Sequence, residues 1–277
     1  NQLVFADNTT RESYLEKKEI VYNLVKGIKN KEFFPKFQPF MDTFTNEIVG
    51  FEAVSRWNLD GRMLRPGCFL EAAEWTGLIY EIELQIFEEA VKFFRELKDN
   101  KDIKISKRFK AAVHFSAYTL KRIEIADLIS ILKQYKISQK DIIIETHEQF
   151  ISDEDAANKI KEFREHRFMV LLDEYSNNNA SLTSLADLKI DAMKLSETLL
   201  EEIDNDQEFT KMMNVYKFLV NIGKQFNITI ISDGINSTQN AKLIKDLDVH
   251  IGIGKHYSKA VVKEEFIEFI LNNKKLR

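Results

Sequence analysis

Apolar residues recur along the chain with two different spacings. From Glu12 to Lys29 they stand at helical intervals with lysines and glutamates between them, which predicts an amphipathic helix. Two extended runs follow, Phe34 to Met41 and Glu47 to Trp57, which together are rich in valine, phenylalanine and other aromatic residues. The polar segment Thr-Phe-Thr-Asn joins them, so the sequence predicts a β-hairpin.

After the hairpin, a helical pair over 68–76 and 79–97 is divided by Gly77, and then short β-type runs alternate with long helical runs. The β-type runs cover 111–115, 141–145, 168–172, 192–195, 228–231 and 249–251. The helical runs between them include 119–135, 154–166, 207–225 and 237–247. This alternation predicts parallel strands, and with the hairpin the strands number eight. We therefore predict an α/β fold, a TIM-like (β/α)8 barrel with an early antiparallel hairpin and an N-terminal lead-in helix.

Chemically reactive side chains stand at the carboxyl ends of these runs. They are His114, Glu145, Asp173 with Glu174, Lys194 and Asp233. A carboxylate at a strand end is more often a helix cap than a ligand, but glutamate and lysine are poor cap residues. The carboxyl ends of parallel barrel strands meet at one mouth, where we expect these side chains to converge. Glu52 joins them if strand alternation turns Phe51 and Ala53 to the opposite face.

Composition narrows the classes of function. A net charge of −4 and a pI near 5.9 give no general attraction to nucleic-acid polymers, which we do not expect as partners. No apolar run approaches the roughly 18 to 20 residues that a membrane span requires. The one cysteine, Cys68, cannot form an intrachain disulfide; we expect a core thiol and a cytoplasmic protein.

Seven segments carry a resemblance to one family. In order they are FEAVSRW (51–57), RPGCF to TGLI (65–79), ETHE (145–148), LDEY (172–175), IDAMK (190–194), SDGIN (232–236) and GKHYSK (254–259). Their order and spacing from about Lys18 to the C-terminus resemble the EAL domain, which bacteria use to bind and hydrolyse cyclic di-GMP. The resemblance implies an EAL-type barrel over residues 18–277.

The first residues carry a further resemblance. Asn1 to Glu19 is similar to the end of a GGDEF domain that leads into an EAL domain. Because there is also no initiator methionine, we expect residues 1–17 to be a linker from an upstream GGDEF-like domain in a longer signalling protein. That parent protein is a candidate for membrane tethering, and the upstream domain is an expected partner.

The resemblance also implies roles for individual residues. Glu52, His114, Glu145, Asp173 and Glu174 correspond to metal ligands, for Mg²⁺ or Mn²⁺, with two ions if the domain is active. Lys194, Asp233 and Glu174 correspond to catalytic residues that orient or deprotonate a water. Arg56, Tyr257 and Ser258 are expected to contact the nucleotide, and Glu148 to anchor the loop after Asp173.

Four positions depart from the family pattern. His114 replaces an asparagine ligand, Glu174 an aspartate, Asp233 a glutamate and Ile253 a glutamine. Imidazole prefers softer ions than Mg²⁺, and small errors in geometry are costly to catalysis. His147 and the remaining histidines show no ligand spacing.

Two hypotheses stay open from the sequence. The first is a degenerate EAL domain that acts as a cyclic di-GMP receptor or as a regulatory module for a partner domain, with weak or no hydrolysis. The second is an active metal-dependent phosphodiesterase that produces pGpG. A homodimer is compatible with either.

Overall fold

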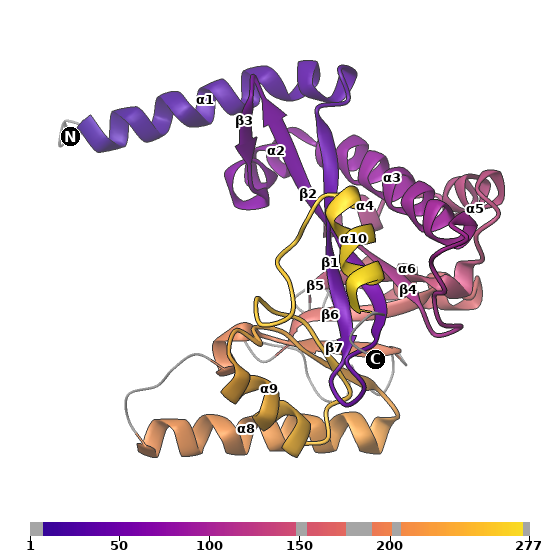
Figure 1. The fold of residues 1–277 in the computed structure, drawn as a ribbon. Coiled ribbons are helices and arrows are strands. Elements are labelled where there is room, and N and C mark those ends of the chain that lie inside the picture. Colours follow the sequence, from indigo (N-terminus) through magenta and orange to yellow (C-terminus); the bar gives the residue numbers. More distant parts are fainter. Residues whose placement is uncertain (1–7, 148–153, 176–189, 201–205, 274–277) are drawn as a thin grey trace.

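The structure is a computed structural model that describes residues 8–147, 154–175, 190–200 and 206–273 (Figure 1). The strands are β1 (Phe33–Asp42), β2 (Ile48–Leu59), β3 (Arg62–Leu64), β4 (Lys110–His114), β5 (Ile142–His147), β6 (Met169–Tyr175), β7 (Ala192–Leu195), β8 (Thr229–Ser232) and β9 (Ile251–Gly252). The α-helices are α1 (Asn8–Lys29), α2 (Leu70–Thr76), α3 (Ile79–Asp99), α4 (Ala117–Leu120), α5 (Ile125–Gln134), α6 (Glu154–Glu165), α8 (Asp206–Phe226), α9 (Thr238–Asp246) and α10 (Lys263–Asn273). Short 3₁₀ turns are η1 (Pro66–Cys68), η2 (Gln139–Asp141) and η4 (Glu197–Leu200).

The strands close into a barrel. Their order is β1-β9-β8-β7-β6-β5-β4-β2, and the pairing of β1 with β2 completes the ring. β1 runs antiparallel to both of its neighbours, whereas β2 and β4 to β9 are parallel. The predicted eight-stranded barrel with an antiparallel hairpin is therefore confirmed. β3, which the sequence analysis did not predict, pairs antiparallel with the end of β2 outside the ring.

The helices cover the outside of this barrel, as the crossovers of a β/α fold require. α3 and α10 pack against β1, α6 packs against β6, and α8 packs against β8. Gly77, at a left-handed φ of 76°, ends α2 at the predicted position. The helix predicted over 119–135 was wrong in its continuity, because Glu124 adopts an extended conformation and separates α4 from α5.

Apolar residues form two separate cores. The larger lies between the barrel wall and the helices and contains most of the buried phenylalanines, Phe51 and Phe94 among them. The smaller is Phe40, Val49, Ala112, Ile143, Leu171, Ala192, Ile231 and Ile253. These residues come from β1, β2, β4, β5, β6, β7, β8 and the position just after β9, and they fill the barrel interior.

Two features lie outside this arrangement. Cys68 is exposed, so the predicted core thiol is wrong: the residue ends η1, which buries no side chain.

α1 projects away from the barrel toward the N-terminus (Figure 1). Over the described residues, we find no helix with the length and apolarity that a bilayer crossing demands.

Candidate functional site

A polar layer lies directly above the apolar interior of the barrel. Successive inward positions on a strand are two residues apart, so Ala112 is followed by His114, Ile143 by Glu145, Leu171 by Asp173, Ala192 by Lys194 and Ile231 by Asp233. On β2, Phe51 and Ala53 are buried in the outer core, which turns Glu52 inward as predicted. The register pairs Glu52 with Ala112 and His114 with Glu145.

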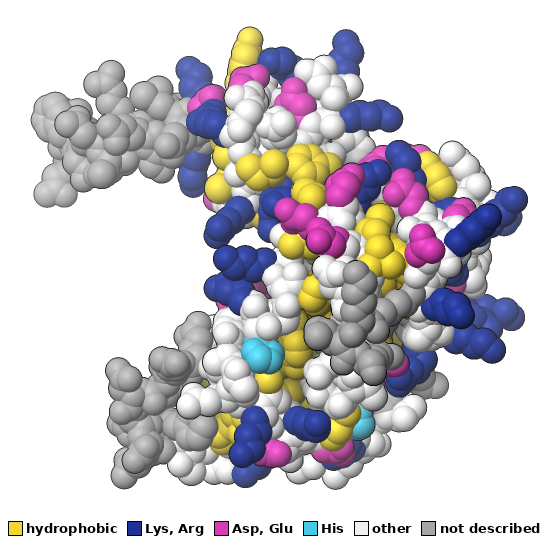
Figure 2. All heavy atoms as spheres, viewed as in Figure 1, with side chains coloured by type: hydrophobic (Ala, Val, Ile, Leu, Met, Phe, Trp, Pro, Cys, Tyr) yellow, Lys and Arg dark blue, Asp and Glu magenta, His cyan; other side chains and the backbone are white. Residues whose placement is uncertain are grey.

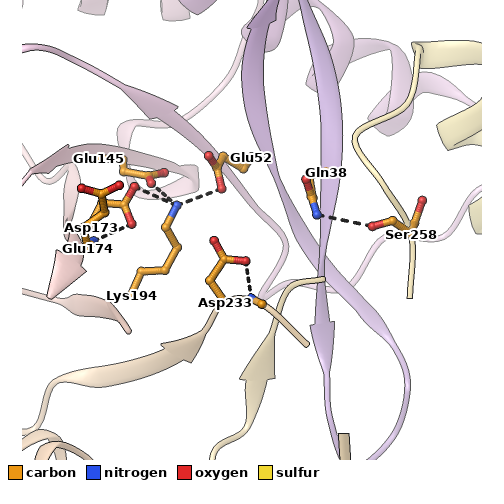
Figure 3. Close-up of polar contacts among 9 residues, drawn as sticks. Gln38, Glu52, Glu145, Asp173, Glu174, Lys194, Asp233 and Ser258 are labelled. Carbon is orange, nitrogen blue, oxygen red and sulfur yellow. Dashed lines mark hydrogen bonds and ion pairs between the residues drawn. The ribbon is translucent and has the colours of Figure 1, made fainter. Parts of the chain in front are cut away.

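Lys194 is the centre of this layer (Figure 3). Its Nζ lies 3.0 Å from Glu52 Oε2 and 3.1 Å from Asp173 Oδ2, and it also donates to Glu145 Oε1. The Lys194 side chain is 4% exposed and that of Glu145 is 0% exposed. Residues separated by up to 142 positions in the sequence thus meet at one point, as the sequence analysis predicted for the strand ends.

Burial and mutual charge shift the pKa values of this group. Burial opposes the charge of Lys194, but Asp173, Glu145 and Glu52 outweigh that effect and raise its pKa well above the ordinary value. Burial, with the neighbouring Glu52, raises the pKa of Glu145 well above its usual range. Burial also acts to raise the pKa of Asp173, but Lys194 reverses this and lowers it to about 2. Lys194 and Asp173 are therefore the charged pair of this cluster at neutral pH.

Three of these side chains can hold a metal ion. One ligand atom each from His114, Glu145 and Asp173 lie within 4.8 Å of one another. Glu145 Oε2 is buried and has no hydrogen-bond partner, which is costly unless a cation satisfies it. Three carboxylates also surround a single ammonium group, so a divalent cation would improve the charge balance. These residues fit one metal ion.

The imidazole of His114 has the protonation state that a metal ligand requires. His114 is half-buried, and loss of hydration together with the neighbouring His147 lowers its pKa to about 3. Its imidazole is therefore neutral at physiological pH, as a metal ligand must be.

Glu174, a predicted ligand for a second ion, points elsewhere. Its side chain is 62% exposed and its Oε2 lies 3.5 Å from His147 Nδ1. Its backbone has a φ of 54°, and its N–H donates to Asp173 Oδ1 at 2.7 Å. The structure thus brings Asp173 into the cluster but not the carboxylate of Glu174.

Asp233 borders the same cluster from β8's side of the mouth (Figure 3). Its Oδ1 accepts from the N–H of Gly234 at 2.6 Å. Burial raises the pKa of Asp233 to about 6, although Lys194 opposes the shift. A carboxyl with that pKa can accept a proton near neutral pH.

A basic cleft adjoins the cluster. It has a volume of about 730 Å³, and its lining includes Lys36, Arg56, Arg65, Lys255 and Lys259 against the acidic Glu197 and Asp233. Figure 2 shows Lys and Arg side chains on the hollowed side of the molecule, between the end that carries α1 and the end that carries α8. Such a cleft attracts a ligand with more than one negative charge.

The predicted nucleotide contacts have different positions in this cleft. Arg56 lines it, and its Nη1 donates to the carbonyl of Ser55 at 2.7 Å. Tyr257 and Ser258 lie in the chain between the lining residues Lys255 and Lys259 but do not line the cleft themselves. Tyr257 packs on the outer core, and the Ser258 carbonyl accepts from Gln38 at 3.4 Å (Figure 3).

Sequence reasoning missed several residues at the site. His147 lies on the same strand face as Glu145, and its ring centroid is 4.6 Å from that of His114. Glu83 on α3 is buried, accepts from the backbone and side chain of Ser116, and has its pKa raised by burial to about 8. The strand period of two could have revealed His147, but nothing in the sequence marks Glu83 as different from the other acidic residues of its helix.

Two further predictions concern the loop after Asp173 and Ile253. Glu148 and residues 176–179 of the loop after Asp173 lie outside the described residues. Ile253 is buried in the apolar interior of the barrel, so its side chain belongs to the core and offers no polar contact.

Comparison with known proteins agrees with this architecture. The model of the EAL domain family matches residues 22–260. Escherichia coli "Probable cyclic di-GMP phosphodiesterase PdeB" is 25% identical over 90% of this chain and 46% of its own length. Bacillus subtilis "Signaling protein YkoW" is 25% identical over 90% of this chain and 30% of its own length. The chain spans less than half the length of these two relatives.

Solved structures share the fold at lower identity. The EAL enzyme Bd1971, in a cAMP and cyclic di-GMP bound form, has a TM-score of 0.85 at 21% identity over 93% of this chain and 70% of that one. The FimX EAL domain of Pseudomonas aeruginosa, bound to cyclic di-GMP, has a TM-score of 0.75 at 16% identity over 87% of this chain and 96% of that one. By its fold, the chain is a β/α barrel with charged side chains at its mouth. The match of the family model over residues 22–260 shows that it belongs to the EAL domain family.

Proposed function

We propose that this domain binds cyclic di-GMP at the mouth of its barrel as a receptor or regulatory module, with weak or no hydrolysis. The observation that carries the proposal is the position of Glu174, which leaves one three-ligand cation group among the described residues. Hydrolysis of a phosphodiester by paired metal ions needs two cations about 4 Å apart. With its carboxylate beside His147, Glu174 is not part of that group, so the residues that the structure describes gather ligands for one ion.

Binding is supported independently of hydrolysis. Five basic side chains line the cleft beside the cluster, and Arg56 is suited to a phosphate because its guanidinium donates in a fixed planar fork. Cyclic di-GMP carries two phosphodiester charges, which complement this lining. The ligand of the related FimX domain structure is the same nucleotide.

The second candidate is an active phosphodiesterase. It is favoured by Asp233, whose pKa of about 6 suits a proton acceptor, and by the convergence of Glu52, Glu145, Asp173 and Lys194. A metal ion, Mg²⁺ or Mn²⁺, would be held by His114, Glu145 and Asp173 and would supply Lewis-acid activation of water. In that reading Lys194 and Asp233 orient the water and take its proton.

The regulatory setting is also part of the proposal. The two relatives compared above are at least twice as long as the segment they share with this chain, which supports an upstream domain as a partner. α1 projects from the barrel and would connect to such a domain. We place the protein in the cytoplasm and keep a homodimer as a further expectation.

Two measurements test the proposal. Calorimetry of the chelator-treated domain with cyclic di-GMP should show binding that Arg56→Ala weakens at least about tenfold, the loss expected for one charged hydrogen-bonding partner. Arg95→Ala is the matched control, because Arg95 pairs with Asp99 on the outside of α3. Chromatography after incubation with Mg²⁺ or Mn²⁺ should show little or no pGpG.

Each other outcome is informative. Turnover that Glu52→Ala abolishes would overturn the receptor proposal in favour of the enzyme. Neither turnover nor binding would overturn both nucleotide functions and leave a module that acts only through protein contacts.

A further inference from the structure

We propose that a cavity at the amino-terminal end of the barrel, opposite the charged mouth, binds a free fatty acid, with its chain against the apolar interior and its carboxylate against Arg108 and Lys110. The cavity has a volume of about 590 Å³. That volume lies in the range of roughly 300 to 1,000 Å³ that is usual for small-molecule pockets. The inference does not depend on the proposed nucleotide function, because the two sites use opposite ends of the strands.

The strand ends place this cavity away from the mouth. Its lining includes the first residues of five parallel strands, which are Lys110 of β4, Met169 of β6, Ala192 of β7, Thr229 of β8 and Ile251 of β9. The charged side chains of the mouth stand at the carboxyl ends of the same set of strands. The apolar interior of the barrel, which contains Ile143 and Ile231, therefore lies between the two sites.

The inward side of the strands continues into the cavity. Inward positions are two residues apart, so Lys110 precedes Ala112 and Thr229 precedes Ile231, and both of the later residues belong to the apolar interior. Met169 is partly buried and packs against that interior. Thr229 is exposed, which places it at the opening of the cavity. An apolar chain that enters here removes apolar surface of the barrel from water.

Arg108 lines the cavity and can offer donors to an anion. Its side chain is 69% exposed, and its Nη2 lies 3.6 Å from Asp42 Oδ2, which is beyond hydrogen-bond distance. Asp42 has other partners, because its Oδ1 accepts from the N–H groups of Phe44 and Thr45 at 3.0 and 2.9 Å. The planar guanidinium of Arg108 can therefore bind the carboxylate of a ligand through two parallel hydrogen bonds.

Lys110 adds a second positive charge to the same lining. Its Nζ donates to the carbonyl of Lys140 at 2.7 Å and lies 3.6 Å from Asp141 Oδ1. The other oxygen of Asp141, Oδ2, accepts from Lys98 Nζ at 2.7 Å. Because an ammonium group has three donors, Lys110 can bind a carboxylate and keep its bond to the Lys140 carbonyl.

The remaining charges of the lining pair with each other. Lys224 Nζ lies 2.7 Å from Asp248 Oδ2, and His250 Nε2 lies 3.3 Å from Asp248 Oδ1. Apart from His250, the lining then has three basic side chains, Arg108, Lys110 and Lys224, against the two acidic ones, Asp42 and Asp248. An apolar cavity with this surplus of positive charge favours a ligand with an apolar body and one carboxylate, and a fatty acid is the simplest molecule of that kind.

The test is a calorimetric titration of the protein with sodium dodecanoate, below the concentration at which it forms micelles. We expect saturable binding of one dodecanoate per chain. Arg108→Gln and Lys110→Gln should each weaken this binding at least about tenfold, the loss expected for one charged hydrogen-bonding partner. Thr229→Phe places a ring at the opening without changing a buried side chain, and it should weaken binding by at least the same factor.

Two controls separate a specific site from adsorption of a detergent. Lys107→Gln removes an exposed lysine next to Arg108 that does not line the cavity, and this variant should bind dodecanoate as the wild type does. Dodecylammonium, which has the same chain and the opposite charge, should bind the wild type at least about tenfold more weakly than dodecanoate.

Three results speak against the proposal. They are an absence of saturable dodecanoate binding, a Thr229→Phe variant that binds as tightly as the wild type, and equal affinities for dodecanoate and dodecylammonium. Arg108 and Thr229 are both exposed, so their variants keep the core intact, and circular dichroism checks that they are folded. The nucleotide titration is a separate measurement, so failure of either proposal is recognised without the other.

Discussion

The barrel interior contains two adjacent layers that come from the same strands but have opposite character. The lower layer, which includes Ile143, Leu171 and Ile231, is apolar and buried. The upper layer, two residues further along, gathers Glu145, Asp173, Lys194 and Asp233.

This contrast shows how a β/α barrel separates stability from chemistry. The lower layer gains free energy from removing apolar area from water, and no particular residue there is indispensable. Burying the charged groups of the upper layer costs hydration free energy. The ion pairs that Lys194 makes with three carboxylates offset this cost. A substitution in the upper layer should therefore leave a buried charge without its partner, whereas a substitution in the lower layer should leave a small cavity.

The largest effect is expected from removing the central cation. Lys194→Met leaves Asp173 and its neighbours buried without a positive partner and should lower the free energy of unfolding by about 3 to 5 kcal/mol at pH 7. Urea unfolding measures this loss. The control is Lys224→Met, which breaks an ion pair with Asp248 whose side chains are 52% and 55% exposed, and it should cost less than about 1 kcal/mol. Equal losses in the two variants would contradict the proposed difference.

Glu83 provides a contrast with the upper layer, because it is a buried carboxyl whose pKa is not lowered by a neighbouring cation. Its pKa of about 8 in the folded protein lies above the ordinary 4.5, so between those values the folded state keeps a proton that the unfolded state has lost. Stability therefore falls as pH rises through this window, by about 3 kcal/mol between pH 5 and pH 7 from this group.

Glu83→Gln should remove that part of the pH dependence. Urea unfolding of the wild type and the variant at pH 5 and pH 7 gives the difference directly. Glu89→Gln, on the exposed side of the same helix, is the control and should follow the wild type. If the Glu83 variant also follows the wild type, the raised pKa is refuted.

The smallest effect is expected in the lower layer. Ile231→Val removes one methylene from the apolar interior and should cost about 1 kcal/mol of stability while nucleotide affinity stays unchanged. Asp233→Asn, two residues further along the chain and just past the end of β8, should change nucleotide binding and its dependence on pH near 6. Calorimetry and urea unfolding of both variants distinguish these roles. A larger affinity change in Ile231→Val than in Asp233→Asn would reverse the assignment of the two layers.

The sequence predicts the barrel and the upper layer well because both follow from periodicity. Alternation on β2 turned Glu52 inward, and the strand ends placed Glu145, Asp173 and Lys194 together. The orientation of Glu174 was not predictable in this way, because it depends on a left-handed backbone at a strand end.

Other residues depend on contacts between elements. Glu83 comes from a helix behind the wall, and its burial arises from packing against Ser116. The basic lining of the cleft comes from five residues scattered between Lys36 and Lys259; Arg56 was expected from its motif, but nothing local to the five shows that they share one cleft. Tertiary packing, and not local sequence, decides these positions.

The central claim is that a charged barrel mouth binds cyclic di-GMP beside a single cation. Crystals grown with Mn²⁺ and cyclic di-GMP, measured for anomalous scattering, test it most directly. We predict one Mn²⁺ at His114, Glu145 and Asp173, with nucleotide in the cleft against Arg56. Two Mn²⁺ ions bridged by Asp173 and Glu174, or nucleotide bound elsewhere, would contradict the account.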